Sequence, residues 1–133
     1  MHTLIRLAPL LLVATATFAF AEEQEFPKDL HGRWTRASAA GRSAAQPFDL
    51  ESLQRKEDGT FAAKLTWTTA DPKCILRFKA ITGRLTPAGD LRFESVTPCG
   101  EEITAELKRS GSGWVGQATN KATPPAVMDL TAK

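Results

Sequence analysis

The side chains that could react or titrate near neutral pH are few and widely spaced in this sequence. Cys74 and Cys99 are the two cysteines, and His31 is the one histidine beyond the first thirty residues. A zinc site would need two more ligands than the cysteines, and His31 alone cannot supply them. We therefore expect a Cys74–Cys99 disulfide, with no metal and no cofactor.

The chain contains few residues that could act as an acid, a base or a nucleophile in catalysis. It contains no tyrosine, and His31 stands beside Gly32 at the start of an expected strand with no nucleophile motif around it. We interpret His31 as an exposed histidine near a strand end. The adjacent Glu101 and Glu102 are expected to be a solvated pair rather than an acid/base dyad. The prediction is that the protein is not an enzyme.

Aromatic residues are the more informative feature, because they fall at expected inward positions of strands. In a small barrel such rings either fill the interior or line a cavity for an apolar or ring-shaped ligand. Small residues at other inward positions, Ala63, Ala80, Ala105, Gly116 and Ala118, would leave room for that ligand. The candidate ligand-binding wall residues are Trp34, Trp67, Phe78, Phe93 and Trp114, with Phe48 and Phe61 also expected inside.

The first residues have the organisation of a secretory signal peptide. Arg6 precedes an apolar run over 7–20, and the small-x-small triplet 19–21 ends it. We expect a signal peptide over 1–21, cleavage after Ala21, and a periplasmic or secreted product. Such a compartment allows thiols to oxidise, which agrees with the expected disulfide. The expected mature chain then has an N-terminal arm over 22–30 and one barrel domain over 31–133.

The charge balance of the expected mature chain excludes some partners. Removing residues 1–21 takes Arg6 out of the 17 Lys and Arg residues and leaves all 15 Asp and Glu residues, so the net charge becomes +1. Basic and acidic residues also alternate along the chain, so no basic patch forms. We expect neither nucleic-acid binding nor membrane insertion, while a small-molecule or protein partner stays open.

Alternating apolar and polar residues predict the strands. In 61–68 the residues Phe61, Ala63, Leu65 and Trp67 share one face, which predicts a strand with one buried side. The same reasoning places Leu76, Phe78 and Ala80 inside, then Leu91 and Phe93, then Ile103, Ala105 and Leu107. Glycine-containing turns separate these segments at 57–60, 87–90 and 110–113.

Strands are expected near 31–38, 47–56, 60–69, 74–86, 89–97, 101–109, 113–120 and 126–132. This pattern predicts an all-β, eight-stranded antiparallel up-and-down barrel, a meander, since closure removes exposed edges. A two-sheet sandwich is the competing architecture. The longer links over 39–46, 70–73 and 121–125 would lie at the barrel ends.

The cysteines can be checked against this register. In a regular hairpin that turns at 87–90, Cys74 would lie opposite a residue a few positions away from Cys99. One or two β-bulges would make up this offset and bring the two cysteines together. The disulfide would then join the open end of that hairpin. Closing a loop of about 25 residues would stabilise the fold by roughly 3 kcal/mol in the chain-entropy model.

The segment Leu30-His31-Gly32-Arg33-Trp34 resembles the start of calycin barrels, the group of lipocalins and avidins. The segment Trp114-Val115-Gly116-Gln117 is similar to the Trp-x-Gly-Gln strand of avidins. The resemblance implies a meander barrel and an interior ligand site. It does not extend to biotin, because avidins carry an asparagine where this sequence has Arg36.

A second resemblance is to small periplasmic inhibitors of metalloproteases, which are disulfide-bearing eight-stranded barrels with an N-terminal arm before a Gly-x-Trp strand. Residues 22–29 have the place and length of that arm. We expect a non-enzymatic exported barrel that binds a small apolar or ring-shaped molecule. A protease inhibitor acting through its arm, and an envelope interaction module using the outer surface, are the alternatives.

Overall fold

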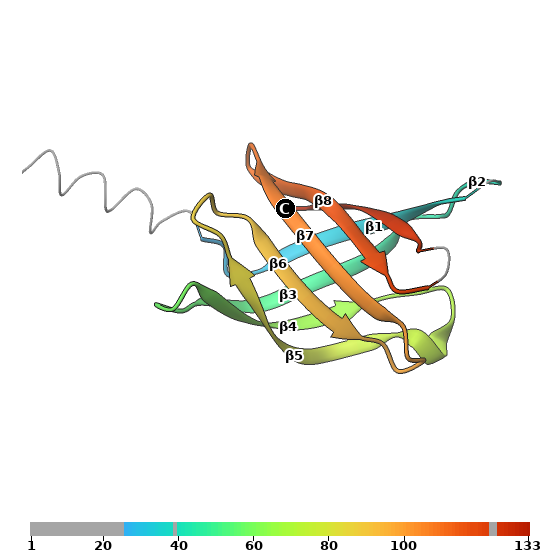
Figure 1. The fold of residues 1–133 in the computed structure, drawn as a ribbon, viewed down its shortest axis with the longest axis horizontal. Helices are drawn as coiled ribbons and strands as arrows, with labels where there is room; N and C mark the ends of the chain where they lie inside the picture. Colours follow the sequence, from blue (N-terminus) through green and yellow to red (C-terminus); the bar gives the residue numbers. More distant parts are fainter. Residues whose placement is uncertain (1–25, 39, 123–124) are drawn as a thin grey trace, which may run out of the picture.

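A computed structural model of the chain describes residues 26–38, 40–122 and 125–133 (Figure 1). Among these residues all regular structure is β, apart from one short 3₁₀ turn, η2 (Pro72–Cys74). The strands are β1 (Leu30–Ser38), β2 (Gly41–Arg42), β3 (Gln46–Arg55), β4 (Thr60–Trp67), β5 (Leu76–Leu85), β6 (Leu91–Val96), β7 (Glu102–Ser110), β8 (Gly113–Asn120) and β9 (Val127–Ala132).

The eight long strands form a closed antiparallel barrel. Each pairs with the next along the chain, and β1 closes the sheet by pairing with β9 from Gly32↔Ala132 to Arg36↔Met128. The up-and-down barrel prediction is confirmed, and the sandwich alternative is wrong. Closure satisfies the main-chain groups of β1 and β9 that would otherwise be exposed edges.

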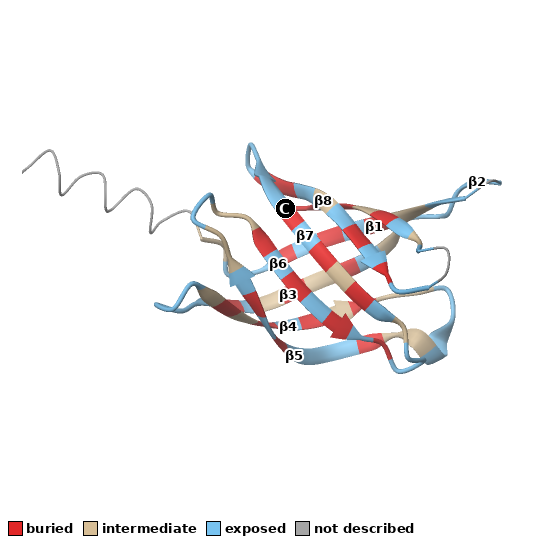
Figure 2. Cartoon of the chain, in the orientation of Figure 1, coloured by how far each residue is buried: buried red, intermediate tan, exposed pale blue. Residues whose placement is uncertain are grey.

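Burial follows the predicted alternation along most strands (Figure 2). On β4 the side chains of Phe61, Ala63, Leu65 and Trp67 are all buried. Leu91 and Phe93 on β6, and Ile103, Ala105 and Leu107 on β7, are buried as predicted. The inward face is therefore set by the period of two that side chains have in a strand.

Strand β5 departs from its predicted pattern. Three residues of β4, Leu65 to Trp67, lie opposite four residues of β5, Leu76 to Lys79, so β5 contains a β-bulge. Leu76 is buried as predicted, but the extra residue shifts the alternation after it, so that Ile81 is the next buried residue. Phe78 and Ala80, predicted to face inward, are both exposed, so these two predictions are wrong.

A second bulge lies in β3, and its main-chain amides donate hydrogen bonds to residues that precede β1. The register shifts between Glu51 and Gln54, and Ser52 has a φ of +54°. The Ser52 amide donates to Asp29 Oδ1 at 2.9 Å, and the Leu53 amide donates to the Lys28 carbonyl at 2.8 Å. The described part of the arm is thus hydrogen-bonded to the barrel, and Phe26 packs against the core.

Two glycines let large rings lie against neighbouring strands. Gly32 pairs with Phe48, and a Cβ at Gly32 would lie 2.4 Å from the Phe48 ring. Gly83 pairs with Phe61, where a Cβ would lie 2.4 Å from the ring and 2.5 Å from the Arg92 carbonyl oxygen. A ring over a strand glycine covers backbone that would otherwise be uncovered.

The two ends of the barrel differ. The loops after β1, β4, β6 and β8 lie at one end, which we call the disulfide end because Cys74 and Cys99 lie in two of them. The turns after β3, β5 and β7 lie at the other, which we call the hairpin end. The described part of the chain contains no helix long and apolar enough to span a lipid bilayer.

Candidate functional site

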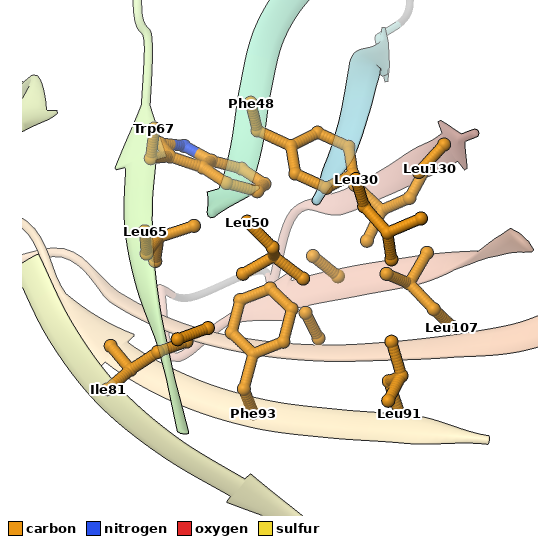
Figure 3. Packing of buried hydrophobic residues seen from close by; sticks show 14 of the residues in the cluster. Leu30, Phe48, Leu50, Leu65, Trp67, Ile81, Leu91, Phe93, Leu107 and Leu130 are labelled. Atoms are coloured by element: carbon orange, nitrogen blue, oxygen red, sulfur yellow. The ribbon is translucent and has the colours of Figure 1, made fainter. Parts of the chain in front are cut away.

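Side chains from all eight long strands meet inside the barrel (Figure 3). Trp34, Trp67, Phe93 and Trp114 belong to this buried cluster. Phe78 lies outside it with 62% of its surface exposed. Of the five predicted wall residues, four face inward and one does not.

The four inward rings do not form one wall. Trp67 ends β4 at the disulfide end, whereas Trp114 follows the turn at the hairpin end. Phe93 lies between them, pairing with Ala105. The structure brings only Trp34 and Trp67 into stacking contact, with ring centroids 5.1 Å apart and planes 11° from parallel.

The two stacked tryptophans differ in the hydrogen bonding of their indole N–H groups. Trp34 Nε1 donates to the Thr68 carbonyl at 3.0 Å, but Trp67 Nε1 is buried and has no hydrogen-bond partner among the described residues. Trp67 is fully buried. A buried donor without an acceptor costs about 1–3 kcal/mol. An acceptor atom of a bound molecule would remove that cost.

Arg36 lies beside this pair on β1. Its guanidinium carbon is 5.9 Å from the centre of the Trp34 ring. One terminal nitrogen contacts Glu101 Oε2 at 3.5 Å and Met128 Sδ at 3.7 Å. The Nε atom is buried, and none of the residues that the structure describes accepts a hydrogen bond from it. These contacts are long for an arginine, so the guanidinium retains unused capacity to donate.

Asn120 holds Glu101 in place at the end of β8. Its Nδ2 donates to Glu101 Oε2 at 3.1 Å, and its Oδ1 accepts from the amides of Ala122 and Ala126 at 3.3 and 2.9 Å. Arg36, Glu101 and Asn120 thus form a polar cluster at the disulfide end, which we call the polar cover. Glu102, in contrast, lies with Lys121 in an exposed ion pair. The expectation of a solvated glutamate pair therefore describes Glu102, while Glu101 is part of the cover.

No signal in the sequence identified the polar cover. Arg36 and Glu101 are 65 positions apart, and the three residues come from β1, the β6–β7 turn and β8. Polar residues near strand ends are common at barrel rims, so their types alone did not distinguish them. Only the closure of β1 onto β9 brings them together.

A hollow of about 350 Å³ opens on the outer surface where β5 and β6 separate. Their ladder contains only the pairs Arg84↔Arg92 and Leu85↔Leu91, near the hairpin end. Beyond these pairs the strands diverge toward the disulfide end, leaving a gap that we call the slit. Its lining is Lys79, Ala80, Ile81, Thr82, Glu94, Ser95, Val96, Glu102, Ile103, Thr104 and Lys121.

The predicted disulfide is present and closes the far end of the slit. Cys74 in η2 is bonded to Cys99 in the β6–β7 turn, with their Cα atoms 4.9 Å apart. The β5–β6 ladder ends at Arg84↔Arg92, well before the cysteines, and the β5 bulge at Phe78 lies in the ladder with β4. The two cysteines therefore meet without the β-bulges that were expected in the β5–β6 hairpin. A second hollow of about 420 Å³ lies next to Cys99 and shares Glu102 and Lys121 with the slit.

His31 lies on the outer surface near the hairpin end. Its Nδ1 is 2.8 Å from Asp49 Oδ1, and this hydrogen bond raises the pKa of His31 above 6.5. The described residues contain no group of three or more His, Cys, Asp or Glu side chains placed to hold a metal ion.

Comparisons with known proteins bear on the fold alone. No protein-family model matches this chain, and no curated protein matches it. Among solved structures, it is similar to a redesigned beta barrel, with a TM-score of 0.55 and 14% sequence identity over 83% of this chain and 91% of that one. This likeness supports the closed barrel architecture.

Proposed function

We propose that this chain is an exported, non-enzymatic binding protein that holds a small ring-shaped molecule against Trp34 and Trp67, beneath the polar cover. Trp67 Nε1 is the observation that carries the proposal, since it is a fully buried donor that has no hydrogen-bond partner within the described part of the chain. A ligand with a flat apolar ring and an acceptor atom would extend the Trp34–Trp67 stack and satisfy that donor.

In this proposal the ligand enters the barrel where the side chains of Arg36 and Glu101 are in contact. The interior is filled by side chains, so the ligand enters at the disulfide end by displacing the long Arg36–Glu101 contact. Because Arg36 Nε has no acceptor among the residues placed in the structure, it favours a ligand whose acceptor is a carboxylate or another anion. The calycin resemblance of the Gly-x-Trp strand supports the same class of function, a barrel that carries a small ligand.

Export is the second part of the proposal. The signal-like residues 1–21 and the Cys74–Cys99 disulfide both suit an oxidising compartment, either the periplasm or the exterior. Sequencing the N-terminus of protein purified from its native host should give Glu22 as the first residue. A product that starts at Met1 would contradict export by cleavage.

The binding proposal can be tested through the three tryptophans of the chain. Titration of ¹⁵N-labelled protein with indole-3-carboxylate, and with aromatic acids extracted from the native host, should shift the indole N–H signals of Trp34 and Trp67. The signal of Trp114, which lies at the hairpin end, should stay in place. Unchanged indole signals with every fraction would contradict the proposal.

Matched variants sharpen this test. Trp67 and Trp114 each carry a buried Nε1 without a partner among the described residues, one at each end of the barrel. Trp67→Phe should weaken binding about five- to tenfold, the value of one hydrogen bond. Trp114→Phe should leave binding unchanged, and equal effects of the two variants would contradict a site at the disulfide end.

A further inference from the structure

We propose that the slit between β5 and β6 binds an extended peptide segment of a partner protein, which pairs with the free main-chain edges of these two strands. This site is separate from the one proposed at Trp67, because the slit opens on the outer surface and its lining contains neither Trp34 nor Trp67.

The first support is the interruption of the ladder. Among the described residues no main-chain pair joins β5 to β6 between Gly83 and the disulfide end. On its other side β5 is paired with β4 through Lys79–Ile81, and β6 is paired with β7 up to Val96. Each strand therefore has one satisfied edge and one open edge, and an open edge is a template for another strand.

Lys79 already provides a substitute for the missing pairing. Its ammonium reaches across the slit and donates to the Val96 carbonyl at 3.2 Å. The edge of β6 thus takes a donor from a side chain because the β5 main chain is too far away to supply one. A peptide N–H in the slit could take over this role while Lys79 turns to solvent.

Each strand that borders the slit has an exposed apolar side chain, Phe78 on β5 and Val96 on β6, and Val96 lines the slit itself. Phe78 directly precedes Lys79, its φ is +48°, and 62% of its surface is exposed. Left-handed backbone is rare for an aromatic residue, and such strain gathers at functional positions. Val96 on the opposite strand is also exposed, at 43%. Phe78 therefore lies on one of the two strands that border the slit, and Val96 lies on the other.

Peptide chemistry fits these open edges better than a compact molecule does. The stretch Lys79–Thr82 is about 13 Å long at the rise of a strand, which matches roughly four residues of extended peptide. Such a peptide presents alternating N–H and C=O groups at the spacing of both edges. In this binding mode main-chain hydrogen bonds provide the affinity, so peptides of varied sequence bind.

A blocked peptide and its methylated counterpart test the proposal. The probe is acetyl-Thr-Val-Thr-Val-amide, and the control has the same side chains with alternate amides N-methylated. Added to ¹⁵N-labelled protein at millimolar concentration, the probe should shift the amide signals of Ala80, Thr82 and Glu94, whose N–H groups lie on the open edges of the two strands. The methylated peptide should bind at least about tenfold more weakly, because it lacks the donors that pair with a strand edge.

Two exposed valines give a matched pair of variants. Val96 borders the slit and is 43% exposed, whereas Val115 faces outward on β8 and is 44% exposed. Val96→Arg should weaken peptide binding, and Val115→Arg should not. Absence of shifts in the slit, or equal binding of the methylated peptide, would overturn the proposal; the latter would assign the hollow to a ligand that needs no main-chain pairing. Neither result depends on the indole signals of Trp34 and Trp67.

Discussion

The Cα atoms of Cys74 and Cys99 lie 4.9 Å apart, and the bond between these residues joins β5 and β6 at the end where the two strands share no ladder. Main-chain pairing at Leu85↔Leu91 holds the opposite end. The strands are thus fixed at both ends and open between them. The disulfide replaces, at one end, the connection that hydrogen bonds provide elsewhere in the barrel.

Removal of the disulfide should destabilise the barrel substantially. The bond closes a loop with a sequence separation of 25 residues, and the double variant Cys74→Ser, Cys99→Ser should lose about 3 kcal/mol of unfolding free energy. Urea unfolding followed by tryptophan fluorescence measures this loss. Reduction of the unmodified protein is the control and should produce the same shift, whereas an unchanged urea midpoint would contradict the prediction.

Gly32→Ala should destabilise the protein by about 1–3 kcal/mol, because the added methyl group overpacks the core against the Phe48 ring. The same substitution should cost less in a Phe48→Leu background, where the ring is absent. A double-mutant cycle measured by thermal unfolding isolates this coupling. Additive effects of the two substitutions would show that the ring does not limit the space at Gly32.

Phe78→Asn should leave stability unchanged or raise it by up to about 1 kcal/mol, because asparagine tolerates the left-handed backbone that Phe78 adopts. The control is Phe93→Ala, which removes a buried ring and should cost about 3–5 kcal/mol. Chemical denaturation compares the two variants. A loss for Phe78→Asn as large as that for Phe93→Ala would mean that Phe78 is buried in solution.

Asn120→Asp should destabilise the disulfide end in a pH-dependent way. The new carboxylate keeps the acceptor for the Ala122 and Ala126 amides but lies against Glu101, to which Asn120 Nδ2 donates. Two facing carboxylates repel when both are ionised. The loss of thermal stability should therefore be larger at pH 7 than at pH 4, and an equal loss at both values would exclude a contact with Glu101.

His31 should add a small stabilisation that fades with rising pH. The hydrogen bond with Asp49 raises the pKa of His31 above its ordinary value of 6.5, so the folded state holds the proton more tightly than the unfolded state does. The contribution is complete below pH 6.5 and disappears as the pH rises through the folded-state pKa. His31→Gln should lower the Tm at pH 5.5 but not at pH 8.5; a difference that persists at pH 8.5 would have another cause.

The sequence by itself determined the strands and most of their inward faces. Alternation at Phe61, Ala63, Leu65 and Trp67 depends only on the two-residue period of a strand, so it was readable without knowledge of any partner strand. Glycine-containing turns located the hairpins for the same local reason. The presence of only two cysteines, with too few further ligands for a zinc site, sufficed to predict their disulfide.

Only the tertiary structure decided where the inward–outward alternation of a strand is interrupted and which residues far apart in the sequence come into contact. Phe78 turns outward because one extra residue of β5 is accommodated against β4, and neither strand shows that mismatch in its own sequence. The contact between Arg36 and Glu101 exists because β1 closes onto β9, and the slit exists because β5 and β6 part after two pairs. A side-chain period is a local property, whereas bulges, closure and strand separation depend on how whole strands pack together.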